Sequence, residues 1–442
     1  MGIVAKVGAV LQQVFGESAE GAAARSGVIQ RQRKFTAISL AKTFVLGFLL
    51  NPESSDEDLA QMASQCGVDV TPQAIEQRHT WRMVGFLEHL FRAATRLVVG
   101  SDRSLAPILD RFTRVDILDS STITLPESMR ERFAGCGGSY GFGAAAMKLQ
   151  TELDLRSGAI EHVEVEPGRS TDGATSRQHV RRGAGSLRIA DLGYFNIGVF
   201  AEMDAEGEYF LSRLQFGTQV FEEQGNAVEL LSWLARHASP VVDRRILLGK
   251  ERRLPCRLIA WRVPPEQAAR RRQKLRKELL DKCGKAPTAE RLAWCDWTIL
   301  VTNVPEDMLT PQEAVVLNRA RWQVELLFKR WKSQGLVAEL SGSTEVRQMV
   351  RVWSRLIAAL VQHWLVVATA WGDPTKSLWK VCQAIRPFVG RIAAGLARID
   401  ELTRALEDLR KAIAKTCKRN KRTKPGTFEM LNDIGLLDFS LT

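Results

Sequence analysis

Hydrophobic residues between Phe35 and about Val99 recur with a helical period. Residues 54–57 read Ser-Ser-Asp-Glu, which is typical of a capped helix start, and the helix that they open is predicted to run through Gln65. Residues 66–70 contain a glycine and break the pattern. The first part of the chain is therefore predicted to be helical.

A second, more polar helix is predicted after this break. Thr71 and Pro72 provide a cap and a first helical residue, and Gln73, Gln77 and Arg78 are expected on the exposed face. A helix, a glycine-containing turn and a polar second helix form the layout of a helix-turn-helix, in which the second helix reads DNA. Most such pairs are ordinary helical hairpins, so DNA contact and a purely structural role remain as alternatives for these side chains.

Beyond the helical region the hydrophobic period changes to two, which is typical of strands. Residues 115–119 predict a short buried strand, and residues 147–155 and 162–166 alternate between apolar and polar positions around a turn. This alternation predicts an antiparallel meander with one face in water. A short helix at 177–181 and another strand at 187–191 are expected to follow.

Residues of about 208 to 304 are rich in strand patterns. The candidate strands lie at 209–211, 244–248, 256–263 and 296–302. Between them, residues 270–277 form the strongly basic run Arg-Arg-Arg-Gln-Lys-Leu-Arg-Lys, whose simplest interpretation is a solvated helix face.

Thr310 and Pro311 cap a long helix that is predicted to reach Lys332 or beyond. At about 100° per residue, its apolar stripe consists of Val324, Leu327, Phe328 and Trp331. An adjoining polar stripe consists of Asn318, Arg321, Glu325 and Lys332. A carboxylate therefore lies beside the core-facing edge, with a guanidinium one turn before it. The structural alternative is a helical ion pair between Arg321 and Glu325, which is worth only tenths of a kcal/mol.

The composition is that of a globular protein of several domains. The chain has 442 residues, 45% of them hydrophobic and 25% charged, and about two to four domains are expected at this length. A formal net charge of +12 favours polyanionic partners, nucleic acid first and an anionic membrane second. A basic enzyme without such a partner is the alternative.

The cysteines argue against a zinc site and against secretion. The chain has seven, scattered and without a C-x-x-C pair. The odd count and the lack of a secretory leader predict reduced thiols and a cytoplasmic protein. Residues 352–370 form the longest apolar stretch, but they include Arg355, Gln362 and His363, so a buried helix is predicted and not a membrane span.

The polar stripe of the long helix resembles the Y-x2-R-x3-E-x6-K signature of the insertion-sequence-four family of bacterial DDE transposases. Arg321, Glu325 and Lys332 match the last three signature positions, and Asn318 stands at the position of the tyrosine. The contact that the tyrosine makes in the family is therefore not carried over to this chain.

Two further motifs resemble the same family. Asp119, in Leu-Asp-Ser-Ser-Thr at the end of the first strand, resembles the first catalytic aspartate of the family. Asp191, in Asp-Leu-Gly-Tyr-Phe, resembles the second. The resemblance covers roughly residues 110 to 370 and, more weakly, 36 to 109. Three motifs in order at compatible spacing are specific, although each alone is modest.

The resemblance implies an α/β fold with an RNase H-like catalytic core, interrupted by a β-rich insertion and flanked by helical regions. The boundaries that the sequence suggests are 1–109 for a helical N-terminal DNA-binding region, 110–207 and 309–372 for the two parts of the core, 208–308 for the insertion and 373–442 for a helical C-terminal region.

The resemblance also implies metal-dependent chemistry. Asp119, Asp191 and Glu325 would hold two Mg²⁺ ions, for which Mn²⁺ can substitute, with Asp119 bridging both. Mg²⁺ prefers hard oxygen ligands, and two such ions can activate the attacking oxygen and stabilise the leaving one. Without metal, three clustered carboxylates would repel one another. Asp116 competes with Asp119 for this role, but three positions earlier on a strand it should point to the opposite face.

DNA contacts follow from the same resemblance. The family equivalents of Arg321 and Lys332 contact DNA phosphate near the cleavage point, and a flipped base stacks on an aromatic residue of the insertion. Trp261 and Trp297 are the candidates for that stacking, with a place in the core as the alternative for each. The implied partners are double-stranded DNA, both transposon ends and target, and a second copy of the chain in a DNA-bound homodimer, with no membrane.

The function that these expectations favour is cut-and-paste DNA transposition, with metal-dependent cleavage of transposon ends followed by strand transfer. One alternative is a non-catalytic DNA-binding regulator derived from a transposase, against which the retained carboxylates argue. The other is a metal-dependent nuclease without strand transfer.

Overall fold

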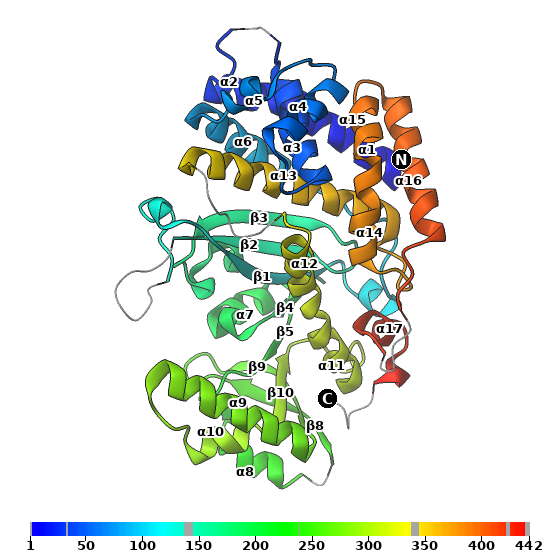
Figure 1. Ribbon diagram of the computed structural model, residues 1–442. Helices are drawn as coiled ribbons and strands as arrows, with labels where there is room; N and C mark the ends of the chain where they lie inside the picture. Colours follow the sequence, from blue (N-terminus) through cyan, green and yellow to red (C-terminus); the bar gives the residue numbers. More distant parts are fainter. Residues whose placement is uncertain are drawn as a thin grey trace. The chain divides into compact units, whose positions relative to one another are not determined.

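The computed structural model describes residues 2–31, 34–136, 145–237, 239–336, 344–420 and 425–437 (Figure 1). It is a mixed α/β protein with helices at both ends of the chain. The chain forms two compact units: unit 1 contains Met1–Leu105, Ser120–Ser170 and Gln323–Arg422, and unit 2 contains Ala106–Asp119, Thr171–Trp322 and Thr423–Thr442. The division falls inside strand β1 (Val115–Thr124), which gives residues to both units.

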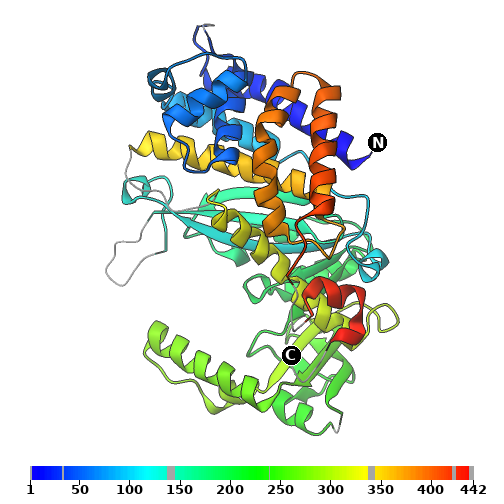
Figure 2. The same ribbon diagram turned by 45° about the vertical axis from the view of Figure 1, so that its right-hand side comes forward.

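Unit 1 is mainly helical and is organised around α13 (Glu345–Ala370). Helices α3 (Ala37–Leu50) and α6 (Trp81–Ala94) pack against α13 and lie along it in both views (Figures 1 and 2). The core of unit 1 is thus shared by segments that are far apart in the sequence. Its other elements are α1 (Ile3–Gln13), α2 (Ala19–Ser26), α4 (Asp56–Gln65), α5 (Pro72–Glu76), β2 (Ala146–Asp154), β3 (Ile160–Pro167), α14 (Leu378–Ile385), α15 (Val389–Gly395) and α16 (Ile399–Lys415).

The apolar stretch at 352–370 lies in α13 and is buried, as predicted. Among the described residues, α13 is the one helix whose length and apolar composition would suffice to cross a membrane, and 94% of its most apolar window is buried inside the protein. That burial is what a core helix shows. Trp364 and Arg355 are among the largest fully buried side chains.

The predicted helix starts near the N-terminus are confirmed. Ser55 caps α4 in a capping box with Asp58, and Gly67 follows with φ of +80°, a left-handed conformation that favours glycine. Thr71 caps α5 and Pro72 is its first residue. However, α5 has only five residues, which is short for a helix that reads a DNA groove.

The predicted meander is only partly confirmed. Strands β2 and β3 form the expected antiparallel pair, but the expected wet face of β2 is wrong, because all nine of its residues are buried, Lys148 and Glu152 included. Gly158 lies in the turn with φ of +75°, and a Cβ there would lie 2.3 Å from the ring of Trp371. The helix expected at 177–181 is only a 3-10 turn at Ser176–His179.

Unit 2 contains a sheet with the strand order β1-β4-β5-β10-β9-β8-β6-β7. The pairs β1–β4 and β4–β5 are parallel, and the pairs from β5 to β10 onward are antiparallel. The strands predicted at 187–191 and between 208 and 304 are confirmed. Their bounds are β4 (Leu187–Ala190), β5 (Tyr209–Arg213), β6 (Val220–Phe221), β7 (Ala227–Val228), β8 (Val241–Leu248), β9 (Leu254–Arg262) and β10 (Trp297–Thr302).

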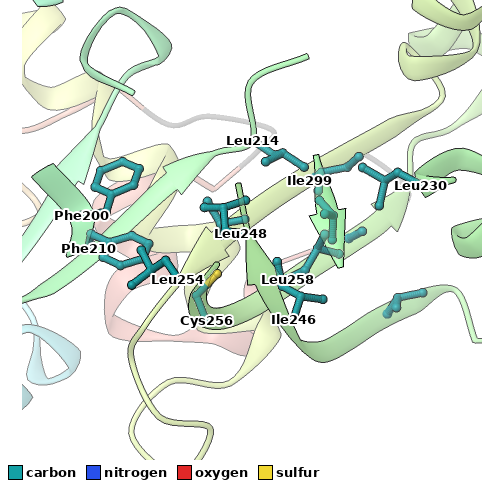
Figure 3. Close-up of a cluster of buried hydrophobic side chains, with 14 of the residues drawn as sticks. Phe200, Phe210, Leu214, Leu230, Ile246, Leu248, Leu254, Cys256, Leu258 and Ile299 are labelled. Atoms are coloured by element: carbon teal, nitrogen blue, oxygen red, sulfur yellow. The ribbon is translucent and has the colours of Figure 1, made fainter. Parts of the chain in front are cut away.

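The helices of unit 2 border this sheet, and its core lies between the strands and α7. Phe200 of α7 stacks on Phe210 of β5 with ring centroids 4.4 Å apart (Figure 3). Leu248, Leu258 and Ile299 extend the same buried cluster. The helices are α7 (Ile197–Ala205), α8 (Leu230–Ala235), α9 (Pro265–Cys283), α10 (Ala289–Trp294), α11 (Pro311–Ala320) and α17 (Thr427–Asn432).

The single long helix predicted from Thr310 is instead two helices. Thr310 caps α11 in a capping box, as expected, but α11 ends at Ala320 and α12 runs from Trp322 to Ser333. Arg321 stands between them with α-helical backbone angles, φ −49° and ψ −34°, so the hydrogen-bond pattern is interrupted without a reversal of the chain. Helical periodicity alone does not reveal such a break.

Candidate active site

Three neighbouring parallel strands bring Asp119, Asp191 and Arg213 into one row. Leu118 of β1 pairs with Ala190 of β4, and Ala190 pairs with Ser212 of β5. The next residue along each strand is a member of the row. Residues in register on parallel strands face the same side, and neighbouring strands lie about 4.8 Å apart. The fold therefore sets two carboxylates and a guanidinium side by side.

Buried apolar residues precede the row on β1 and β4 and anchor both strands in the core. Val115, Ile117 and Leu118 of β1 are at most 1% exposed, and Leu187, Ile189 and Ala190 of β4 are fully buried. Leu118, Ala190 and Tyr194 form a small core cluster directly before and after the aspartates. Burial ends at the row, because the Asp119 and Asp191 side chains are 16% and 38% exposed.

Arg321 faces both aspartates. Its Nη1 lies 3.7 Å from Oδ2 of Asp119, and its Nε lies 3.7 Å from Oδ1 of Asp191. These distances are within ion-pair range but longer than hydrogen bonds. One planar guanidinium thus divides its charge between two carboxylates without a directional bond to either. Of the signature residues predicted from the sequence, Arg321 is the one that unit 2 places beside both aspartates.

Arg213 is a member of the row that sequence reasoning missed. Its guanidinium is partly exposed, and partial burial lowers its pKa from the ordinary value, while Asp191 raises the pKa and Arg321 lowers it further. The influence of both neighbours on one group identifies Arg213 as part of the same charged cluster. The only sequence signal was its place at the end of a strand, and strand register cannot be read from the sequence.

The remaining signature residues lie on both sides of the helix break. Asn318 is on α11 in unit 2, and its Oδ1 is a buried acceptor with no hydrogen-bond partner in the described part of the chain. Glu325 and Lys332 are on α12 in unit 1, Glu325 half-buried and Lys332 exposed. The apolar stripe predicted for this helix is confirmed, because Val324, Leu327, Phe328 and Trp331 are all buried.

Asp116 lies outside the row of Asp119, Asp191 and Arg213, as predicted. Its side chain is 2% exposed and forms ion pairs with Arg114, at 2.7 Å, and with Arg182, at 3.8 Å. Both oxygens therefore face guanidiniums of the protein itself. This environment is that of a structural buried carboxylate.

The tryptophans proposed for base stacking are both buried. Trp261 is 3% exposed and Trp297 is 7% exposed. Trp297 belongs to the hydrophobic core of unit 2, and the guanidinium of Arg262 lies 5.0 Å from its ring centroid. Burial favours the alternative interpretation of both as core residues, since a stacked base needs an accessible ring face.

The polar residues in and directly after α5 differ in their exposure. Gln73 and Gln77 are exposed, whereas Arg78 is half-buried and its guanidinium lies 5.5 Å from the ring centroid of Phe35. Two of the three predicted DNA contacts are thus accessible, and the third is engaged in packing. Contact with DNA through this segment stays a prediction.

The side chains of unit 2 provide part of the ligands that a divalent cation needs. Within the described ranges, no group of three or more His, Cys, Asp or Glu side chains gathers closely enough to hold a metal ion. Asp119 and Asp191 by themselves offer two hard carboxylate oxygen donors on neighbouring strands, the ligand type that Mg²⁺ prefers together with water. Their shared guanidinium shows that this position already attracts positive charge. The seven cysteines are all free thiols.

Comparison with known proteins finds similarity over the part of the chain that contains the charged row. Residues 110–361 match the family described as the transposase DDE domain. The chain is 27% identical over 372 residues to the transposase for insertion sequence element IS231B of Bacillus thuringiensis subsp. berliner, across 77% of this chain and 75% of that protein. It is 23% identical over 369 residues to the transposase for insertion sequence element IS1151 of Clostridium perfringens, across 77% and 76%.

A third relative matches over a shorter stretch of the chain. Over 230 residues the chain is 25% identical to the putative transposase InsL for insertion sequence element IS186A of Escherichia coli (strain K12), across 50% of this chain and 61% of that protein. The residues that match the family domain include Asp119, Asp191, Arg321 and Glu325.

Proposed function

Since the chain belongs to the family of transposases with a DDE domain, we propose that it is a cut-and-paste DNA transposase. In this proposal it cleaves the ends of an insertion sequence and joins them to target DNA. The observation that carries the proposal is the in-register placement of Asp119 and Asp191 directly after the paired residues Leu118 and Ala190 of neighbouring parallel strands. Asp119 lies in the middle of β1 and Asp191 directly follows β4, at the point where burial gives way to partial exposure.

The fold elements support a catalytic core of the RNase H type. Strands β1, β4 and β5 are parallel, and β2 and β3, which lie between β1 and β4 in the sequence, are an antiparallel pair. Under the proposal, residues 110–207 and 309–372 form the core. The antiparallel strands β6 to β10 with α8, α9 and α10 fall inside 208–308 and support an insertion there.

Each polar residue has its own task in the proposed reaction. Asp119, Asp191 and Glu325 would hold two Mg²⁺ ions, or Mn²⁺, and the bound ions would activate the attacking oxygen and stabilise the leaving oxygen of the phosphodiester. Arg321 and Lys332 would bind DNA phosphate, Arg321 through a guanidinium fork and Lys332 as a point charge. Asn318 has a buried acceptor without a partner in the described residues, which a bound nucleotide could satisfy.

The proposed partners are double-stranded DNA and a second copy of the chain. The net charge of +12 supports a polyanionic partner, and the resemblance to the family supports a dimer that brings two DNA ends together. The proposed place of action is the nucleoid in the bacterial cytoplasm.

The test is cleavage of a plasmid that carries the gene with its flanking DNA. In Mg²⁺, the wild type should nick at the element ends, and Asp119→Ala, Asp191→Ala and Glu325→Ala should each abolish nicking while they still bind DNA. Glu223→Ala is the matched control, because it removes an exposed carboxylate from the turn between β6 and β7. Nicking by the wild type at an undiminished rate in excess EDTA would contradict the proposed metal-dependent chemistry.

The same assay separates the two alternatives. A wild type that binds the ends but never cuts them would favour the non-catalytic regulator. Cutting without joined products in the presence of target DNA would favour a nuclease without strand transfer.

A further inference from the structure

Helix α9 carries the strongly basic run, and its charge is not balanced within the helix (Figure 1). Its 19 residues include seven Lys and Arg but only three Asp and Glu, so α9 holds a net +4 of the formal +12 of the chain. Helix α16 shows a solvated helix of the same protein, with four basic and four acidic residues. A helix that is only solvated needs charge but no particular sign, so solvation does not explain the excess on α9.

Two arginines of the run hold α9 on the sheet. Arg271 Nη1 donates to the carbonyl oxygen of Trp297 at 3.2 Å and to Oγ1 of Thr298 at 3.0 Å. Arg272 forms an ion pair with Asp296. Trp297 and Thr298 belong to β10, and Asp296 directly precedes it. These contacts fix the position of the helix within unit 2 and occupy two of its cations.

Three other cations form a stripe on the exposed side of α9. At about 100° per residue, Arg270, Lys274 and Lys277 fall within about 60° of one another. All three side chains are exposed. Lys274 lies 3.7 Å from Glu278, in a pair that is open to solvent on both sides, and such a pair holds its partners only weakly. The stripe therefore presents positive charge to solvent from a helix that is fixed in place.

The attachment of α9 lies near the charged row that contains Arg213. Arg213 pairs with Leu300 of β10, and Thr298, which binds Arg271, is two residues earlier on the same strand. Two residues span about 7 Å of a strand, and their side chains point to the same face. Burial lowers the pKa of Arg271, and the charge of Arg213 lowers it further. The first turns of α9 are thus attached beside the row.

We propose that Arg270, Lys274 and Lys277 bind the phosphate backbone of duplex DNA, as a contact separate from the charged row and independent of base sequence. The inference rests on the proposed function for DNA as the partner, but it requires no catalysis. The three cations spread over about 10 Å of helix, and the phosphates of one strand repeat about every 3.4 Å along the duplex. The stripe therefore spans several phosphates, and Glu266 and Asp281 limit it one turn beyond either end.

The stripe fits a duplex better than an anionic membrane. A helix that lies in a membrane interface needs a broad apolar face opposite its cations. Leu275 and Leu279 of α9 are half-buried, and of its leucines only Leu280 is exposed. Contacts to phosphate carry no sequence information. The surface would therefore hold any DNA that passes the row, whatever its bases.

The experiment measures the affinity of the full-length protein for a fluorescein-labelled duplex of random sequence, by anisotropy at several salt concentrations. The α9 triple variant combines Arg270→Gln, Lys274→Gln and Lys277→Gln, and glutamine keeps a similar helix propensity. Its slope of log affinity against log salt should be shallower than that of the wild type by about 2.7, since each neutralised phosphate contributes about 0.9. Each single replacement should give about one third of this change.

Helix α16 supplies a control with the same change in net charge. Arg404, Lys411 and Lys415 are exposed and fall within about 40° of one another, but Asp408 lies between them in the sequence and pairs with Arg391. Replacement of the three cations by glutamine should leave the slope near that of the wild type. Equal flattening by both triple variants would assign the effect to net charge and overturn the proposed surface, as would an unchanged slope in the α9 variant.

Two further comparisons test the partner and its recognition. The α9 variant should lose affinity for end DNA and for random DNA by the same factor, and a loss confined to end DNA would overturn sequence independence. Sedimentation with vesicles of phosphatidylserine and phosphatidylcholine tests the membrane. Vesicle binding that is lost in the α9 variant, together with an unchanged DNA slope, would assign the stripe to a membrane and overturn the proposal.

The outcomes separate this inference from the proposed function. An unchanged slope in the α9 variant, with Mg²⁺-dependent nicking by the wild type, would overturn the surface and leave the transposase intact. A wild type that binds no DNA at low salt would contradict both. Near-ultraviolet circular dichroism checks that each variant is folded, and the single replacements carry the measurement if the triple variant is not.

Discussion

Two aspartates three residues apart on β1 have opposite surroundings. Asp116 is buried between Arg114 and Arg182, whose side chains are 25% and 6% exposed. Asp119 is partly exposed and shares Arg321 with a second carboxylate. The first carboxylate is matched by the protein's own cations, whereas the second belongs to a pair that shares the Arg321 guanidinium at 3.7 Å.

This difference predicts effects of different size on the free energy of unfolding. Asp116→Asn leaves two guanidiniums without their anion in a buried place, and should lower the free energy of unfolding by about 3 kcal/mol. Asp119→Asn removes one of two like charges from a partly exposed site, and should change it by less than about 0.5 kcal/mol. Urea denaturation followed by circular dichroism measures both. A larger loss in Asp119→Asn than in Asp116→Asn would contradict this assignment.

Lys332 offers a test of phosphate contact that is free of stability effects. It is exposed on α12, so Lys332→Ala should leave the melting temperature nearly unchanged. If it neutralises one phosphate, the slope of log affinity against log salt should become shallower by about 0.9. Fluorescence anisotropy with cleavage-site DNA at several salt concentrations measures the slope. An unaltered slope together with normal strand transfer would leave Lys332 without a DNA role.

His363 couples the stability of unit 1 to pH. Its ring lies in the core with Nε2 2.7 Å from the carbonyl oxygen of Gly158, and burial lowers its pKa to about 4. The unfolded chain, with a pKa of about 6.5, takes up the proton first as pH falls. Stability should therefore be unaffected above about pH 6.5 and fall by about 3 kcal/mol as pH drops to about 4.

The control for this titration is His363→Gln, which has no ionisable ring. Urea midpoints of the variant should depend less on pH between about 6.5 and 4 than those of the wild type. The same pH dependence in both proteins would assign the acid lability to other groups.

At the scale of elements, α11 shows how a local signal fixes part of the site. Thr310 Oγ1 accepts a hydrogen bond from the Glu313 amide at 3.3 Å, and the Glu313 carboxylate accepts from the Thr310 amide at 2.8 Å and from Arg111 at 2.7 Å. This capped end orients the helix that carries Asn318 and leads into Arg321.

Removal of the cap should weaken the helix without touching the charged row. Thr310→Ala loses the side-chain cap and should lower the free energy of unfolding by about 1 kcal/mol, and Thr310→Ser should recover most of it. Because Arg321 lies at the other end of α11, Mn²⁺ affinity should not change in either variant. A change in Mn²⁺ affinity with Thr310→Ala would show that the cap also sets the position of Arg321.

Local patterns predicted the starts of helices well and the environment of the elements poorly. The caps at Ser55, Thr71 and Thr310 follow from side-chain chemistry that acts within one turn. The wet face expected on β2 is wrong because burial depends on what covers a strand, and that is a tertiary property. The break at Arg321 is equally invisible to periodicity, since the helical phase continues through it.

The candidate site was predictable residue by residue but not as an arrangement. Asp119, Asp191 and Arg321 could be named from motifs, and unit 2 places them together. Arg213 could not, because its role depends on the register of β5 against β4. Where Glu325 and Lys332 act in the proposed site stays a prediction from the family signature.

At the scale of the whole molecule, the N-terminal helices are part of a larger core. Helices α3 and α6 pack on α13 inside unit 1. Deletion of residues 1–109 would remove these partners and uncover a helix that is buried along most of its length. A test of DNA recognition by this region therefore calls for point substitutions.

The double variant Gln73→Ala and Gln77→Ala changes two exposed side chains, one in α5 and one at its C-terminal cap, so stability should change by less than about 0.5 kcal/mol. If α5 reads the transposon ends, the preference for end DNA over random DNA in a gel-shift competition should fall about tenfold or more, since each lost base contact is worth about 1–3 kcal/mol. Gln61→Ala, exposed on α4, is the matched control. An intact preference would place recognition outside this helix.

The interleaving of the two units has a consequence for synthesis on the ribosome. Each unit takes one of its three segments from beyond Trp322: unit 1 needs Gln323–Arg422, and unit 2 needs Thr423–Thr442. A nascent chain emerges from its N-terminus, and domains generally fold as units once their segments are available. Neither unit can be complete before residues beyond Trp322 have been translated. A ribosome that stops before α13 therefore releases a chain in which α3 and α6 lack this packing partner, and chaperones and proteases would recognise their exposed apolar faces.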